Sequence, residues 1–275
     1  MRAEIITSAQ NSKIKLLLEL QEKSKTRKKE GLFVVEGRRE LLHCIEAGYV
    51  PFAIFFCPEI INECDRAEIE KAIEKQNAAA GGKKPLAIEV PQQLYDKVAY
   101  RGGTEGVVAE MYCKDLSLDS LKLKENPLIV VLESVEKPGN LGAVLRSADA
   151  SGVDAVIVCD PLTDMYNPNL IRSSIGAIFT VPVATAKSDE AIAWLKEKGA
   201  KIYTAQLQNS EWYYDTDMKG ATAIVMGTEA TGLTNAWRNA ADAHIKIPML
   251  GRLDSLNVSV SAAILMYEAV RQRNS

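Results

Sequence analysis

The chain has 275 residues, 47% of them hydrophobic and 25% charged, which is the composition of a globular protein with one large or two modest domains. Its 33 basic and 36 acidic residues give a formal net charge of −3, so any nucleic acid would have to bind a local basic face. Five scattered cysteines without a CxxC pair, and only two histidines, argue against a disulfide framework and against a metal site. No apolar run is long enough to span a membrane and no signal-peptide core is present, so we expect a cytoplasmic protein.

The first hundred residues alternate between helical and strand patterns. The spacing predicts helices over residues 12–21, 38–48, 62–76 and 91–99, and strands over 32–36, 51–57, 85–90 and 106–111. We interpret residues 1–112 as a small α/β domain. Residues 113–126 show neither period, and we interpret them as a linker.

A second series of elements begins with PLIVVLESV at 127–135, a nearly continuous apolar run that is typical of a strand buried on both faces of a parallel sheet. Further strands are predicted at 154–159, 179–183, 200–206, 221–227 and 242–248, separated by helices. Residues 127–275 therefore predict an α/β domain with a mostly parallel six-stranded sheet. Ligands of such sheets bind beyond the carboxyl ends of the strands.

Residues 23–39 form the most basic stretch of the N-terminal domain. A solvated loop is the simplest explanation of such a charge run. The alternative is a surface that contacts the phosphates of a nucleic acid. The candidates for such contacts are Lys25, Arg27, Lys28, Lys29, Arg38 and Arg39.

Three segments that follow strands combine glycine with polar side chains. The first segment, residues 136–152, has the sequence EKPGNLGAVLRSADASG, in which the GxGxxG spacing of a dinucleotide-binding loop is absent. Asn140 can cap the following helix. Arg146 could form an i,i+3 ion pair with Asp149, or its guanidinium could bind a phosphate through paired donors.

The second segment, VMGTEATGL at 225–233, places Glu229 in a loop between Gly227 and Gly232. Glu229 could cap a helix, or it could lie beside a cationic or hydroxyl-bearing ligand. The third segment, residues 247–270, begins with the turn IPMLGR and continues as a predicted helix, because Leu256, Val260, Ile264 and Tyr267 fall on one helical face. Ser255 and Asn257 precede this helix and suit its N-cap.

Together these segments resemble the SpoU (TrmH-type) branch of the SPOUT RNA methyltransferases, through NLGAVLRSA, VMGTEATGL and IPMLGRLDSLNVSVSAA. Residues 1–115 are similar, more loosely, to the ribosomal-protein-like RNA-binding domain that many members with ribosomal RNA substrates carry, through FVVEGRREL and GVVAE. The resemblance implies a deep trefoil knot at the C-terminal end of the sheet. It also implies a homodimer with the active site near the subunit interface, S-adenosylmethionine as methyl donor and RNA as partner.

The resemblance also assigns functional positions. The family's catalytic positions fall on Asn140, Arg146, Glu229, Ser255 and Asn257. The contacts to the methyl donor, made largely by the backbone in this family, fall on Thr204, Ala205, Gly227, Ile247 and Leu256. Thr228, where relatives frequently have asparagine, is one small departure.

The reaction that the resemblance implies is methyl transfer to a ribose 2′-hydroxyl. The expected substrate is ribosomal RNA of the 23S type. The family's arginine has been proposed as the base, but a guanidinium with a pKa above about 12 is costly to deprotonate. Our hypothesis is that Arg146 grips a phosphate and stabilises the developing alkoxide. The alternatives are a transfer-RNA ribose methyltransferase and a catalytically silent ribosome-assembly factor.

Overall fold

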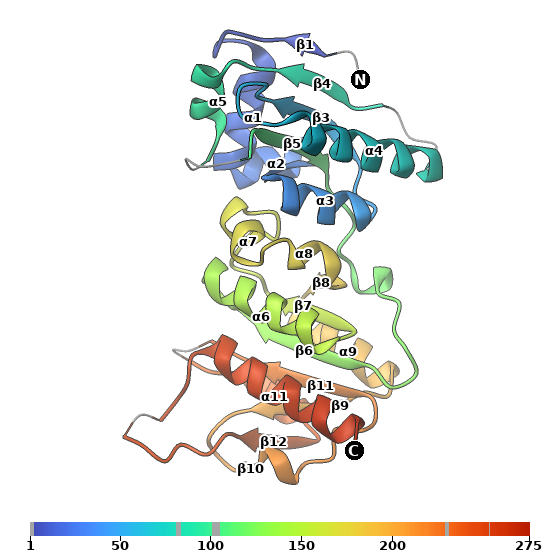
Figure 1. Cartoon of the computed structure of the whole chain (residues 1–275). Coiled ribbons are helices and arrows are strands. Elements are labelled where there is room, and N and C mark those ends of the chain that lie inside the picture. The colour runs from blue at the N-terminus through green and yellow to red at the C-terminus, as the bar shows by residue number, and fades with distance from the viewer. Residues whose placement is uncertain (1–2, 81–83, 101–104, 229–230, 253) are drawn as a thin grey trace. The chain divides into compact units, whose positions relative to one another are not determined.

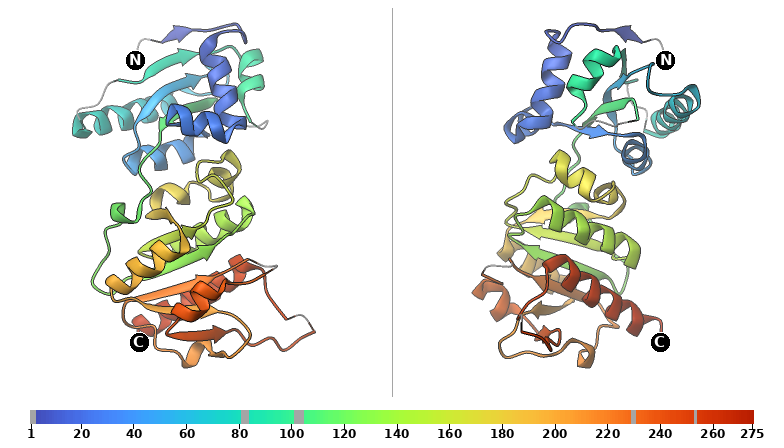
Figure 2. Two further views of the ribbon diagram at one scale, coloured as in Figure 1. Left: turned by 180° about the vertical axis from the view of Figure 1, so that it is seen from behind. Right: turned by 60° about the vertical axis from the view of Figure 1, so that its left-hand side comes forward.

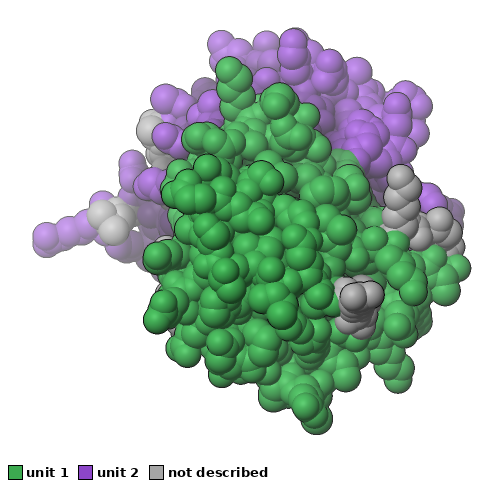
Figure 3. Space-filling model, turned by 90° about the horizontal axis from the view of Figure 1, so that it is seen from above, with its two compact units in different colours: residues 1–114, 164–180 green, residues 115–163, 181–275 purple. Residues whose placement is uncertain are grey.

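The computed structural model describes residues 3–80, 84–100, 105–228, 231–252 and 254–275. The chain divides into two compact units, which are coloured separately in Figure 3. Unit 1 comprises Met1–Lys114 and Asp164–Thr180, and unit 2 comprises Asp115–Thr163 and Val181–Ser275. Among the described residues, no helix combines the length and the apolar character needed to cross a membrane.

Unit 1 is built on a mixed sheet with the strand order β1-β4-β3-β5-β2. Its strands are β1 (Glu4–Ile5), β2 (Leu32–Glu36), β3 (Pro51–Phe56), β4 (Leu86–Glu89) and β5 (Val107–Tyr112). Strands β1, β4 and β3 are parallel, whereas β5 runs antiparallel to both β3 and β2. The predicted α/β alternation of this part of the chain is therefore present, with β1 as an addition.

Helices cover both faces of this sheet (Figures 1 and 2). They are α1 (Ser12–Glu22), α2 (Ser24–Glu30), α3 (Arg38–Glu46), α4 (Glu63–Ala80) and α5 (Gln92–Val98). Ile14, Leu17 and Leu20 of α1 and Leu94 of α5 are buried in one core with strand side chains. Helices α3 and α4 pack against each other.

The segment Asp164–Thr180 packs with unit 1, although it lies inside the predicted C-terminal domain 127–275. It carries helices α7 (Pro168–Ser173) and α8 (Ala177–Thr180). The rings of Phe33 and Tyr166 stack with their centroids 4.3 Å apart, and Phe179 lies 5.8 Å from Phe33. This aromatic packing joins chain segments far apart in the sequence, so local periodicity could not predict it.

Unit 2 is built on a sheet in which every strand pair is parallel, with the order β10-β12-β9-β11-β6-β7-β8. Its strands are β6 (Leu128–Glu133), β7 (Ala155–Cys159), β8 (Val183–Ala186), β9 (Lys201–Ala205), β10 (Glu211–Trp212), β11 (Thr222–Met226) and β12 (Ala243–Lys246). The prediction of six strands is wrong by one, because the two-residue edge strand β10 is too short to show a period.

Two layers of helices enclose this sheet. Helices α6 (Pro138–Ser151) and α11 (Val258–Arg273) pack against each other on one face (Figure 1). Helices α9 (Ser188–Glu197) and α10 (Asn235–Ala240) contribute Trp194, Leu195 and Trp237 to the core on the other face. Two short 3₁₀ helices, η1 (Leu118–Ser120) and η2 (Tyr213–Asp215), complete the described elements.

Two predictions of local structure are wrong. The predicted strand at 179–183 is instead the end of α8 followed by β8, which begins only after Pro182. Its β-branched and aromatic composition favoured a strand, but residues that suit a strand also suit a buried helical turn. The basic stretch includes helix α2 and not only a loop, because polar residues without an apolar period leave no sign of a helix.

Candidate functional site

A cleft of about 150 Å³ lies at the carboxyl ends of β9 and β12, where a parallel sheet is expected to bind ligands. Three of the predicted donor-binding residues line it, namely Ala205, Ile247 and Leu256. The predicted catalytic residue Ser255 lines it as well. Thr204 and Gly227 are not among the lining residues; Thr204 is fully buried, with its Oγ1 2.6 Å from His244 Nδ1.

The third segment leads from β12 past this cleft to α11. Asn257 is the N-cap of α11, and its side-chain oxygen accepts the backbone N–H of Ser259 at 3.0 Å, as the N-cap chemistry predicted. The other side-chain atom of Asn257, Nδ2, donates to Oδ1 of Asn140 at 3.1 Å. This hydrogen bond brings together two of the predicted catalytic residues, which are 117 positions apart.

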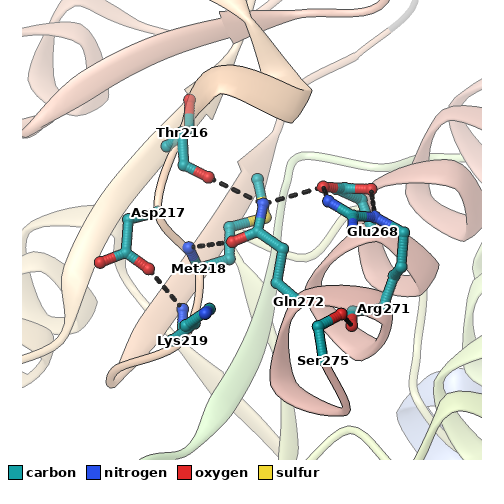
Figure 4. A network of polar contacts seen from close by, with 8 residues as sticks. All are labelled: Thr216, Asp217, Met218, Lys219, Glu268, Arg271, Gln272 and Ser275. Carbon is teal, nitrogen blue, oxygen red and sulfur yellow. Dashed lines mark hydrogen bonds and ion pairs between the residues drawn. The ribbon is translucent and has the colours of Figure 1, made fainter.

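Helix α11 is anchored at its opposite end by the polar network of Figure 4. Gln272 donates to the carbonyl oxygen of Thr216 at 2.9 Å and accepts the N–H of Met218 at 2.8 Å. Hydrogen bonds from Arg271 lower the pKa of the Glu268 carboxyl group, which also accepts from Gln272. Because both ends of the helix are held, Asn257 is presented from a fixed element.

Helix α6 carries the predicted catalytic arginine. Arg146 is exposed, and its side chain has no hydrogen bond or ion pair with any residue that the structure describes. The alternative of an i,i+3 ion pair with Asp149 is therefore not what the structure has. An exposed guanidinium without a partner among the described residues suits the binding of an external anion.

In the second segment, the described residues on either side of positions 229–230 lie against each other after β11. An ideal Cβ added to Gly227 would lie 2.3 Å from the carbonyl carbon of Gly232 and 2.6 Å from the backbone nitrogen of Leu233. The loop therefore returns across Gly227 at a distance that only glycine permits. The predicted catalytic residue Glu229 lies outside the described residues.

A buried polar network lies beside this loop, at the carboxyl ends of β6 and β7. Glu133, which is 3% exposed, accepts hydrogen bonds from the backbone N–H and the hydroxyl of Thr234, both at 2.8 Å. The hydroxyl of Ser188 lies 3.1 Å from Glu133 and 2.6 Å from Asp160, and it accepts the indole N–H of Trp237 at 3.0 Å. These bonds fix the starts of α9 and α10 and the end of the second segment.

Comparison with known proteins identifies the chain. The model of the SpoU rRNA methylase family matches residues 127–267, and the model of an MRM3-like substrate binding domain matches residues 11–109. The chain belongs to the SpoU rRNA methylase family. The resemblance inferred from the three segments is thereby confirmed, and so is the substrate-binding character of the N-terminal part.

Several relatives of this SpoU-family chain match it over almost its whole length. The 23S rRNA (guanosine(2553)-2′-O)-methyltransferase RlmP of Bacillus subtilis is 30% identical over 267 residues, which are 95% of this chain and 97% of the relative. The crystal structure of an RNA 2′-O ribose methyltransferase, 34% identical, covers 99% of this chain and 100% of its own with a TM-score of 0.79. An rRNA methyltransferase of Sinorhizobium meliloti with bound AdoMet is 26% identical and covers 98% of both chains with a TM-score of 0.86.

The predicted RNA contacts of unit 1 do not all reach its surface. Arg27 is only 4% exposed, and it donates to Asp164 at 2.6 Å and to the backbone carbonyl of Leu20 at 2.6 Å. The structure contradicts the prediction that Arg27 contacts RNA, because these bonds use its guanidinium inside the protein. Arg38 is tied to Asp65 and Glu68. The predicted contacts that are exposed are Lys25, Lys28, Lys29 and Arg39.

Several cleft residues were missed by sequence reasoning. Gln206, Leu207 and Lys246 line the cleft directly after or at the end of β9 and β12. Their position at strand ends was the signal that could have found them, because the loops after parallel strands were already expected to bind the ligand. Asp254 and Leu265 also line the cleft. Among the described residues, no cluster of three or more His, Cys, Asp or Glu side chains could hold a metal ion.

Proposed function

We propose that this SpoU-family protein transfers the methyl group of S-adenosylmethionine to a ribose 2′-hydroxyl of ribosomal RNA of the 23S type. The observation that carries this proposal is the hydrogen bond between Asn257 and Asn140. It joins the segment whose Ser255 lines the cleft to the helix that carries Arg146, whose side chain has no partner among the described residues. The cleft and the helix that carries this cation are thus linked through two polar side chains.

The cleft fits part of the methyl donor. Its aliphatic side chains, including Leu207, Ile247 and Leu256, suit a purine ring, and the strand ends offer backbone groups for hydrogen bonds. The Asp254 carboxylate at the cleft complements the positive charge of a sulfonium. Thr204 and Gly227 would act indirectly, by fixing the strand end at Ala205 and the loop of the second segment. S-adenosylmethionine, when bound, supplies an electrophilic methyl group.

The residues around Arg146 would align and activate the ribose. Arg146 would bind the phosphate next to the target nucleotide through paired N–H donors and stabilise the charge that develops on the 2′-oxygen. Asn140, Ser255 and Asn257 would orient the sugar, and Glu229 would fix Arg146 or the loop. Alignment of the two reactants can lower the barrier by several kcal/mol, up to about 7–11 kcal/mol.

We further propose a homodimer and a trefoil knot formed by the second and third segments. Much of the apolar face that the sequence predicted for α11 is exposed: Val260 is 46% and Tyr267 is 50% exposed, whereas Ile264 is half-buried. Leu250, in the loop that Figure 1 shows between β12 and α11, is 96% exposed. A second copy of the chain would bury this stripe, and the burial of apolar area is what stabilises permanent dimers.

In this proposal, residues 1–112 form the RNA-binding domain, 113–126 the linker and 127–275 the methyltransferase domain of a cytoplasmic enzyme. The family model that matches residues 11–109 supports the role of the first domain. Lys25, Lys28, Lys29 and Arg39 are the exposed cations that would contact phosphates.

Labelled methyl transfer to separated ribosomal and transfer RNA tests this function. We expect label in large-subunit ribosomal RNA, at one position that becomes resistant to alkaline cleavage, because 2′-O-methylation removes the attacking hydroxyl. Label confined to transfer RNA would overturn the substrate, and a calorimetric titration without S-adenosylmethionine binding would overturn the enzymatic function. An Arg146→Ala preparation should transfer label about 10²–10³-fold more slowly. Replacement of Lys196, an exposed cation on α9, by alanine should leave the activity unchanged.

A further inference from the structure

Unit 1 contains a groove of about 550 Å³ that is separate from the cleft of unit 2. Its volume lies within the roughly 300–1,000 Å³ typical of small-molecule sites. Strand β2, helix α3 and helix α7 contribute to its lining, all of them within unit 1. The lining residues that matter here are Gly37, Arg39, Glu40, Tyr100, Glu105 and Arg172.

Hydrogen-bond acceptors converge in this groove at Gly37. An ideal Cβ on Gly37 would lie 3.0 Å from Oε2 of Glu40 and 3.7 Å from Oε2 of Glu105, so the two carboxylates approach one point. Glu105 accepts the backbone N–H of Arg38 at 2.5 Å, and Glu40 accepts from Arg39 at 2.8 Å. Since a carboxylate offers about four lone-pair sites, both retain acceptor capacity for a ligand.

Hydrogen-bond donors are provided by Arg172 at the end of α7. Arg172 is exposed and lines the groove, and its side chain has no hydrogen bond or ion pair with any residue in the described part of the chain. Its guanidinium presents five N–H donors in a fixed planar fork. Such a fork recognises two adjacent acceptor atoms of a ligand.

An aromatic ring completes the groove. Tyr100, which is 39% exposed, is held at its backbone and at its hydroxyl group. Its backbone N–H donates to Glu36 at 3.0 Å, and its hydroxyl oxygen accepts from Asn169 at 3.3 Å. A partly exposed ring in a fixed orientation is a surface on which a nucleobase can stack.

The charges of the groove favour a base over a phosphate. Three arginines and three glutamates line it, so its formal charge is zero and it does not attract a polyanion by charge alone. Guanine combines adjacent N–H donors on its Watson–Crick edge with the adjacent acceptors O6 and N7 on its major-groove edge. The two carboxylates match the first set, and Arg172 matches the second.

We propose that this groove binds an unpaired guanine of the RNA substrate, with the base stacked on Tyr100. This assignment rests on the proposed function, because it requires that unit 1 meets RNA. Gln21 also lines the groove, and helix α2 begins three residues later at Ser24. The exposed lysines of α2 can then contact the phosphates that flank the bound base.

Binding of short labelled RNA to the full chain tests the proposal. The probes are a fluorescein-labelled 12-nucleotide oligouridine and the same strand with one central guanosine or one central adenosine, measured by fluorescence anisotropy. We expect the guanosine strand to bind at least about fivefold more tightly, because a bidentate base contact contributes about that much discrimination or more. Glu105→Gln and Arg172→Ala should abolish this preference. Tyr100→Ala should weaken binding of all three strands, whereas Tyr100→Phe should not.

The matched control is Lys71→Ala, an exposed cation on α4 outside the groove, which should bind all three strands as the wild type does. Unfolding curves and S-adenosylmethionine calorimetry on every variant separate loss of folding from loss of the site. Unchanged guanosine preference in both Glu105→Gln and Arg172→Ala, or no preference in the wild type, overturns the guanine site. Absence of S-adenosylmethionine binding overturns the proposed enzymatic function and leaves the oligonucleotide result to be judged by itself.

Discussion

The two halves of the carboxyl edge of the unit 2 sheet differ in what covers them. At β6 and β7, the buried carboxylate of Glu133 and the hydroxyls of Ser188 and Thr234 bond to one another, and the starts of α9 and α10 close the edge. At β9 and β12, the strand ends face an open cleft. Polar groups at the strand ends of one sheet therefore have two roles. Where helices cover the strand ends, these groups stabilise the fold, and where the strand ends border the cleft, they can bind a ligand.

The largest expected effect is on Arg146, whose helix α6 is joined to the segment beside the open half by the Asn257–Asn140 hydrogen bond. Because Arg146 has no partner among the described residues, Arg146→Ala should leave folding and S-adenosylmethionine affinity unchanged. Single-turnover methyl transfer should fall about 10²–10³-fold, as it does when one donor to a developing oxyanion is removed. Arg146→Lys keeps the charge but not the planar fork, so it should recover only part of the rate.

Two outcomes would contradict this account of Arg146. A lysine variant that keeps most of the rate would show that paired donors are not needed. An alanine variant that binds RNA poorly but reacts at the normal single-turnover rate would show that the charge does not stabilise the reacting oxygen.

The boundary between the two halves is the second segment, and Gly227→Ala should disrupt it. The new methyl group would lie 2.3 Å from backbone atoms of Gly232, so the loop must move. We expect a loss of about 1–3 kcal/mol or more in the free energy of unfolding, measured in urea, together with weaker S-adenosylmethionine binding by calorimetry. Gly220→Ala is the matched control, since a Cβ there meets nothing within 4 Å. Equal stability and equal S-adenosylmethionine affinity of the two variants would show that Gly232 does not lie so close to Gly227.

At the closed half, Glu133→Gln should destabilise unit 2 by about 1–3 kcal/mol, because an amide cannot accept the hydrogen bonds that both carboxylate oxygens accept from Thr234. The measurement is urea unfolding. Glu136→Gln, an exposed glutamate three residues later, should have no effect. A loss of S-adenosylmethionine affinity together with stability would show that the Glu133 network also positions the second segment beside the cleft. Unchanged stability would show that Glu133 does not make the hydrogen bonds described here.

Local patterns could be predicted from the sequence, whereas contacts between distant segments could not. The apolar run before Glu133 and the helical spacing after Asn257 are local patterns, so the parallel strands and α11 were predicted well. The assignment of Asn257 and Asn140 to one site came only from the family resemblance, and their hydrogen bond was not predicted. The burial of Arg27 could not be predicted, because its partner Asp164 is 137 positions away, and a lone arginine in a basic stretch looks the same whether or not it finds a carboxylate.

Unit 1 contains a buried carboxyl group that differs from Glu133 in its hydrogen bonding. Glu110 is 1% exposed, its Oε1 has no hydrogen-bond partner among the described residues, and burial raises its pKa to about 8. A raised carboxyl pKa means that the stability is full below the ordinary value of 4.5 and is lost as the pH rises through about 8. Glu110→Gln should therefore stabilise the protein at pH 8 and hardly at all at pH 4.5.

Unfolding in urea at a series of pH values measures this difference. Glu74→Gln, an exposed glutamate on α4, is the control and should follow the wild type at every pH. A Glu110→Gln variant whose stability depends on pH as that of the wild type does would show that Glu110 is paired in solution.

The smallest expected effect concerns α2, in which Arg27 is buried and three lysines are exposed. Replacement of Lys25, Lys28 and Lys29 by alanine should flatten the dependence of RNA binding on salt, by up to about 2 in the slope of log affinity against log salt, because each contact to a single strand contributes about 0.7. The matched control replaces Lys71, Lys75 and Lys97, which are exposed in the same unit, and should keep the wild-type slope. An equal slope in all three proteins would mean that the α2 lysines form only a solvated surface, as the simplest explanation of the charge run holds.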